Sequence, residues 1–62
     1  MKLLTIEIQD GENTYYEYYL LKENEHYSVE DYADGFLRVV KSAYTKKITK
    51  EEIKVLKKFG VV

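Results

Sequence analysis

The chain has 62 residues, a formal net charge of −1 and no cysteine. A chain of this length forms one domain at most, and it buries only about 60% of the surface that its unfolded form exposes. We therefore expect a single small domain over residues 1–62. No apolar run is long enough to span a membrane, and the lack of cysteine fits a reducing compartment, so the expected location is the cytoplasm.

The N-terminal segment has the pattern of a β-hairpin. From Leu4 to Gln9, apolar and polar residues alternate, which predicts a half-buried strand. Asp10 and Gly11 then predict a turn, because glycine tolerates positive φ and aspartate bonds its own backbone. A second strand is expected from about Thr14 to Lys22.

The register of this hairpin can be argued from Glu17. Residues 15–19 contain four of the chain's seven tyrosines, and in a strand two of them must point to each face. An unpaired carboxylate among the isoleucines of the first strand would be costly. We therefore expect a loop of three or five residues, which puts Glu17 outside and Tyr16, Tyr18 and Leu20 in the core.

The next segment predicts a first helix. Ser28 has the character of an N-cap, and Asp31, three residues later, completes a variant of the capping box. The apolar residues between Val29 and Tyr44 gather on one side at helical spacing, while the charged residues fall outside that side. We expect this apolar side to cover one face of the hairpin.

A second helix is predicted near the C-terminal end of the sequence. Thr49 and Glu52 form a capping box, and Gly60 suits the left-handed position that ends a helix. The expected fold class is therefore α+β: an N-terminal antiparallel β-hairpin followed by two α-helices packed on one sheet face, in the order ββαα.

The outer sheet face is the main candidate for a binding surface. In the expected register it carries apolar and aromatic side chains at Leu3, Tyr15, Tyr19 and Leu21. Tyrosine is enriched at interfaces, and a two-stranded sheet is marginal alone and has open edges. We therefore predict a protein-interaction module that binds another protein or forms a homo-oligomer. The plainer interpretation is that tyrosines tolerate exposure on a strand, where their β-propensity is useful.

The charge is divided along the chain. Residues 1–37 hold nine acidic residues and two lysines, whereas residues 38–62 hold eight basic and two acidic ones. The basic half contains a group that we call the lysine stripe: Lys46, Lys47, Lys50, Lys54, Lys57 and Lys58. Weak binding of an anionic partner, either nucleic acid or an acidic protein, is the alternative function. The lysine stripe lacks arginine and interleaved aromatics, which argues against specific nucleic-acid binding and leaves a solvated helix face as the plainer interpretation.

The sequence offers no catalytic constellation. His26 is the only histidine, and it lies in a polar segment without the partners that general acid–base or metal chemistry needs. Glu30 and Asp34 are explained as a solvated, acidic first helical turn. We therefore predict a protein that is not an enzyme, with no cofactor and no metal site.

Overall fold

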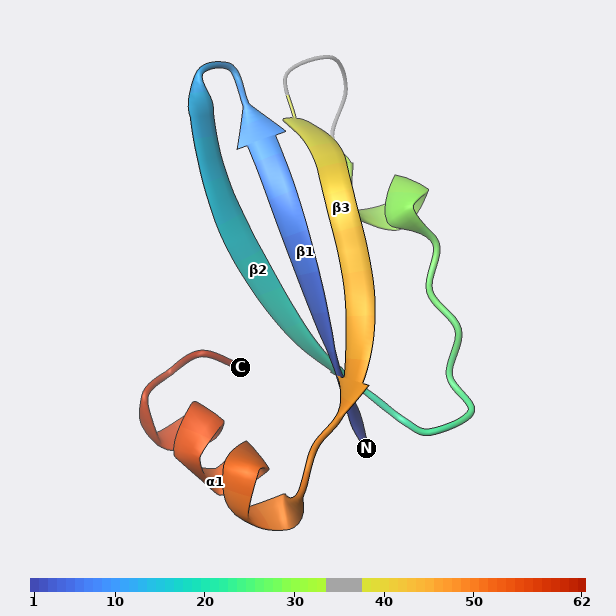
Figure 1. Cartoon of the computed structure of the whole chain (residues 1–62), viewed down its shortest axis with the longest axis vertical. Helices are drawn as coiled ribbons and strands as arrows, with labels where there is room; N and C mark the ends of the chain where they lie inside the picture. Colours follow the sequence, from blue (N-terminus) through green and yellow to red (C-terminus); the bar gives the residue numbers. More distant parts are fainter. Residues whose placement is uncertain (34–37) are drawn as a thin grey trace.

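The computed structural model describes residues 1–33 and 38–62. Within them lie three strands, a short 3₁₀ turn and one α-helix (Figure 1). In chain order these are β1 (Lys2–Asp10), β2 (Asn13–Leu21), η1 (Val29–Tyr32), β3 (Arg38–Lys47) and α1 (Lys50–Lys58). The strands form one antiparallel sheet in the order β2-β1-β3, so β1 is the central strand.

The expected ββαα arrangement is wrong, because the segment assigned to the first helix forms a third strand. Of the described residues in this segment, only Val29–Tyr32 turns helically, as the 3₁₀ element η1, and Arg38–Lys47 pairs with β1 as β3. The part of the predicted helix at residues 34–37 lies outside the described residues. Ser28 is extended and makes no side-chain capping bond. The valines and tyrosine of β3 favour a strand, and the free edge of β1 offers them backbone partners.

The turn between β1 and β2 is shorter than expected. Asp10 pairs with Asn13, which leaves Gly11 and Glu12 as a two-residue loop. Gly11 has a φ of 63°, and no described residue other than glycine has positive φ. Positive φ at the first central position alone matches a type II′ turn, whose twist suits a hairpin. The prediction of a loop with an odd number of residues is therefore wrong.

Glu17 shows why that prediction failed. It lies opposite Ile6, on the face that was expected to exclude it. Its carboxylate is not unpaired, because Oε1 accepts the hydroxyl of Tyr19 at 2.7 Å and forms an ion pair with Arg38. Arg38 begins β3, so a third strand supplies the charge that a two-stranded hairpin lacked.

The core lies on the sheet face that includes Glu17, which we call the covered face. Leu4, Ile6 and Ile8 are fully buried, and Leu21 is 4% exposed. The residues that pack against this cluster are partly buried: Tyr19, Tyr27, Tyr32, Val40 and Ala43. The segment that includes η1 therefore helps to cover this face, and the rings of Tyr19 and Tyr32 lie 4.8 Å apart between centroids.

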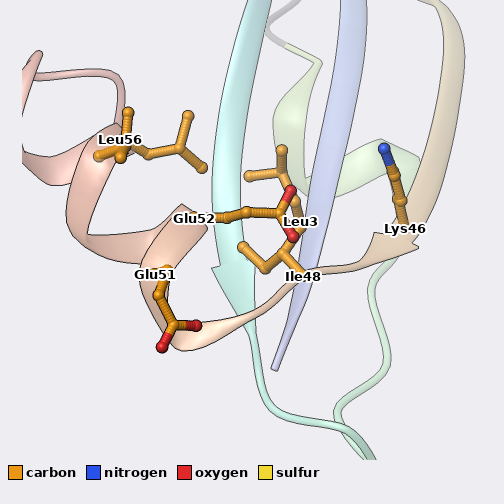
Figure 2. A pocket seen from close by; sticks show the side chains of 7 residues that line it. Leu3, Lys46, Ile48, Glu51, Glu52 and Leu56 are labelled. Atoms are coloured by element: carbon orange, nitrogen blue, oxygen red, sulfur yellow. The ribbon is translucent and has the colours of Figure 1, made fainter.

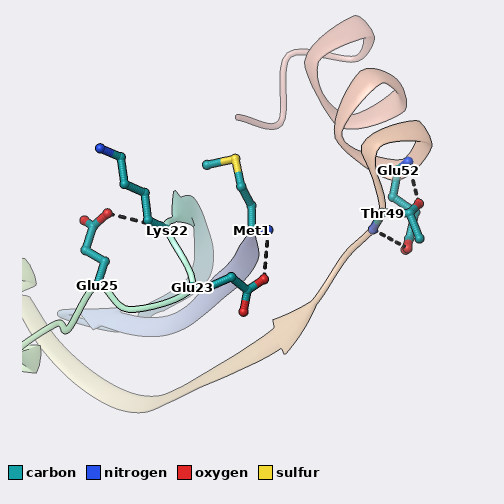
Figure 3. Close-up of polar contacts among 6 residues, drawn as sticks. All are labelled: Met1, Lys22, Glu23, Glu25, Thr49 and Glu52. Atoms are coloured by element: carbon teal, nitrogen blue, oxygen red, sulfur yellow. Dashed lines mark hydrogen bonds and ion pairs between the residues drawn. The ribbon is translucent and has the colours of Figure 1, made fainter.

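The predicted ends of the second helix are confirmed in α1. Thr49 Oγ1 accepts the backbone N–H of Glu52 at 3.2 Å, and the Glu52 carboxylate accepts the backbone N–H of Thr49 at 3.0 Å (Figure 3). The hydrogen bond from the Thr49 backbone, followed by the interaction with the Thr49 side chain, lowers the pKa of the Glu52 carboxyl. At the other end Gly60 has a φ of 72°, and Val61 N–H reaches the carbonyl of Leu56 at 2.9 Å. This is the Schellman ending.

The helix stands apart from the sheet. Figure 1 shows α1 beyond one end of the strands, and its Cα atoms stay more than 8 Å from those of β1, β2 and β3. At the same end, the backbone N–H of Ile48 donates to the carbonyl of Met1 at 3.3 Å. The Met1 amino group also forms an ion pair with Glu23 at 2.9 Å (Figure 3). No helix within residues 1–33 and 38–62 combines the length and apolar character that crossing a membrane requires.

Candidate functional site: an open tyrosine face and an apolar pocket

The sheet face opposite the core is exposed, and we call it the open face. Thr5 of β1 pairs with Tyr18 of β2 on one side and with Tyr44 of β3 on the other. Tyr18 and Tyr44 are 37% and 57% exposed, whereas Thr5 between them is only 6% exposed. Two tyrosines from the two outer strands thus flank a buried threonine while leaving much of their own surface in solvent.

The neighbouring row of the open face is aromatic at one edge and polar elsewhere. Glu7 pairs with Tyr16 on β2 and with Ser42 on β3. Tyr16 is 55% exposed, and the Ser42 hydroxyl donates to the Glu7 carboxylate at 3.0 Å. Just beyond this row the pairing of β1 and β3 shifts, which leaves Lys41 as the extra residue of a β-bulge. The open face therefore combines three exposed phenol rings with a hydrogen-bonded acidic group.

The residues predicted to bind a partner do not share one surface. Leu3 lies on the open face, whereas Tyr15, Tyr19 and Leu21 alternate onto the covered face. Leu21 is 4% exposed and Tyr19 packs against the core, so neither is free to contact a partner. Tyr15, at 36% exposed, is accessible only from the covered side.

The sequence reasoning placed Tyr16 and Tyr18 in the core and Tyr44 on a helix. All three are instead exposed tyrosines of the sheet. Residues 39–45 include β-branched and aromatic residues, which suit a strand as well as a helix. This composition is the sequence signal that could have placed Tyr44 in the sheet.

A pocket opens between the sheet and α1, next to the last row of the open face. It has a volume of about 370 Å³ (Figure 2). Leu3 of β1, Ile48 of the link and Val55 and Leu56 of α1 supply apolar walls. Lys46, Glu51 and Glu52 also line the pocket. A pocket with this lining suits an apolar side chain better than a charged one.

All six members of the lysine stripe are exposed. Four of its members lie on α1, and Lys46 and Lys47 end β3 at the same end of the sheet. The acidic residues Glu51 and Glu52 occupy the first turn of the same helix, and Lys57 and Lys58 occupy its last turn. The helix therefore carries charge of opposite sign at its two ends.

Across residues 1–33 and 38–62, no three histidine, cysteine or acidic side chains are grouped so that they could hold a metal ion. His26 is exposed. The open face offers three phenol rings beside the Glu7 carboxylate, and the pocket offers aliphatic walls together with charged lining residues.

Comparisons with protein-family models, with curated proteins and with solved structures find no match to this chain. The function is therefore argued from the geometry of these two surfaces.

Proposed function

We propose that this domain is a protein-interaction module, located in the cytoplasm, that binds a protein partner through its open face. The observation that carries the proposal is the row in which Tyr18 and Tyr44 flank Thr5 and remain 37% and 57% exposed. Tyrosine combines a large apolar area with a hydroxyl that needs a partner when buried, and its ordering costs little entropy because the ring has few rotatable bonds. Tyr16 extends the same aromatic surface by one row.

The extent of the exposed surface also supports a binding role. The accessible surface of the chain is 4895 Å². A folded monomer of this mass is expected to expose roughly 4,200 Å². The open face would suit a partner with a flat, largely apolar contact area. Polar groups at the rim of that area would bond the phenol hydroxyls.

The test compares tyrosines on opposite faces of the sheet. Changing Tyr18 and Tyr44 together to serine should remove the central contacts and weaken partner binding by roughly tenfold or more, as expected for aromatic hot-spot residues. Tyr15→Ser is the matched control, because it removes the same ring from β2 on the covered side. Quantitative affinity capture from the native cells, with each variant as bait, measures the loss.

Circular dichroism first establishes that both variants remain folded. A partner that is retained by wild type and by Tyr15→Ser but lost with the open-face variant supports the proposal. Equal retention by all three baits would contradict it, as would a loss that is specific to Tyr15→Ser.

The second candidate function is weak binding of an anionic partner through the lysine stripe. Its specific support is the exposure of all six lysines, four of them on α1 and two at the adjoining end of β3. Changing Lys54 and Lys57 to glutamate should abolish any binding to duplex or single-stranded nucleic acid. Binding by the wild-type chain should be micromolar or weaker and should fall steeply with salt, because neutralised phosphates release counterions. A fluorescence titration at low salt measures this binding. If no binding is detected at low salt, the stripe is only a solvated surface.

A further inference from the structure

We infer that two copies of this chain associate through α1, with the helices antiparallel and Phe59 of each copy inserted into the apolar pocket of the other. This surface is separate from the open face, and the occupant is a second copy of the chain. The inference rests on the exposure of Phe59, the lining of the pocket and the charges at the two ends of the helix.

Phe59 is the side chain that most needs a partner. It follows the last residue of α1 and is 73% exposed, more than any other large apolar residue among those described. It lies four residues after Val55, on the same side of the helix, and Val55 is itself 52% exposed. Together with Ile53 and Leu56, which are half-buried, they form the apolar side of α1, and the Cα atoms of this helix stay more than 8 Å from those of the strands. A helix whose apolar side is partly uncovered is incomplete as a packed element.

The pocket lies where an antiparallel neighbour would place Phe59. Its lining residues on the helix are Glu51, Glu52, Val55 and Leu56, so it borders the N-terminal half of α1. Antiparallel pairing brings the C-terminal end of one helix beside the N-terminal half of the other. The available volume of about 370 Å³ is ample for an aromatic ring, since an apolar cavity of about 150 Å³ already holds benzene.

The charges on α1 favour the same orientation. Glu51 and Glu52 lie in the first turn, and Lys57 and Lys58 lie in the last. In an antiparallel pair the acidic turn of each helix faces the basic turn of its neighbour, and the relation is reciprocal under two-fold symmetry. A parallel pair would instead oppose like charges at both ends. At helical spacing Glu51 and Lys58 fall on the same edge of the apolar side, so they are the residues that should meet across the interface.

A partner copy would also add buried apolar surface to a chain whose own core is small. Among the described residues only Leu4, Ile6, Ile8 and Leu21 form the buried apolar core. Oligomerisation is one of the ways in which a chain shorter than about 70 residues reaches adequate stability. Covering the apolar side of α1 and filling two pockets at once would bury apolar surface on both copies.

The experiment is sedimentation equilibrium of the full chain over a dilution series. The wild-type chain should dimerise reversibly, and Phe59→Ser should raise the dissociation constant roughly tenfold or more.

Glu51→Lys and Lys58→Glu should each weaken self-association, because each opposes like charges across the interface. An equimolar mixture of these two variants should associate again, because the reversed charges then face each other. Lys54→Glu is the matched control, since it makes the same charge change on the opposite side of the helix and should have no effect.

Three results would overturn the inference. The first is a wild-type chain that stays monomeric at the highest concentration reached. The second is a mixture of the charge-reversed variants that associates no better than either alone. The third is self-association that is lost when Tyr18 and Tyr44 become serine but survives Phe59→Ser, which would assign the dimer to the open face. The charge-reversed variants still test the inference if Phe59→Ser perturbs the end of the helix, because Glu51 and Lys58 are exposed and their substitution should leave the fold intact.

Discussion

Replacing Ile6 with alanine is expected to remove a large part of the stability of the domain. Ile6 is fully buried at the middle of the central strand, where Glu17 and Ala43 are its neighbours across β2 and β3. Truncating a buried isoleucine removes its transfer free energy and leaves a cavity, which costs about 2–5 kcal/mol. The total stability of a chain of this length is roughly 3–9 kcal/mol, so this one change removes a large part of it. Urea denaturation followed by circular dichroism measures the loss.

The matched variant is Tyr18→Ala. Its side chain is larger than that of Ile6, but it is 37% exposed on the open face. The expected cost is therefore only about 1 kcal/mol or less, close to that of other surface substitutions. The register expected from the sequence put Tyr18 in the core, where the same truncation would cost about 3–5 kcal/mol. If Tyr18→Ala proved as damaging as Ile6→Ala, the two-residue turn and the register of β2 would be contradicted.

Features fixed by neighbouring residues could be predicted from the sequence. The period of two in β1, the turn at Gly11 and the caps of α1 each depend on side chains within a few positions of one another. The exposure of the four stripe lysines that lie on α1 follows from helical spacing in the same way. These elements match their predictions because the residues that determine them lie within one turn or one strand of each other.

The third strand could not be predicted on this basis. The segment around Val40 has apolar residues that fit one side of a helix, yet it also has the valines and tyrosine of a strand. The choice is made by the unpaired edge of β1, whose backbone groups gain partners only when β3 is present. That edge is a tertiary property, and local propensity is readily overridden by such pairing.

The candidate site was missed for a related reason. Shifting a strand by one residue exchanges every side chain between the two faces. The error at the turn therefore moved Tyr15 and Tyr19 outward and Tyr16 and Tyr18 inward in the expected fold. The expected odd loop length rests on a single free-energy cost, that of burying the Glu17 carboxylate unpaired. Arg38, 21 residues away along the chain, removes that cost, and no pattern near Glu17 indicates it.

Glu17 itself is the site of the second large expected effect. Glu17→Gln keeps the shape of the side chain but removes the charge that pairs with Arg38. The two side chains are 28% and 27% exposed, between the limits of a surface pair and a buried one. The variant should therefore lose about 1–2 kcal/mol of unfolding free energy, between the value for an exposed ion pair and that for a buried hydrogen bond to a charged group. Glu12→Gln, in the exposed turn, is the matched control and should leave stability unchanged.

The pH dependence of stability provides a second readout of the same contacts. Burial, followed by the hydrogen bond to Glu17, raises the pKa of the Tyr19 hydroxyl. Because the folded state holds this proton more tightly than the unfolded chain, the stabilisation is fully present below the ordinary tyrosine pKa of about 10. It is lost as the pH rises through the raised value of the folded state. In Glu17→Gln the negative charge beside Tyr19 is gone, so the alkaline loss should be smaller than in the wild type. Denaturation curves at neutral and alkaline pH test this, and identical pH profiles for the two chains would show that Glu17 does not hold Tyr19 and Arg38 together.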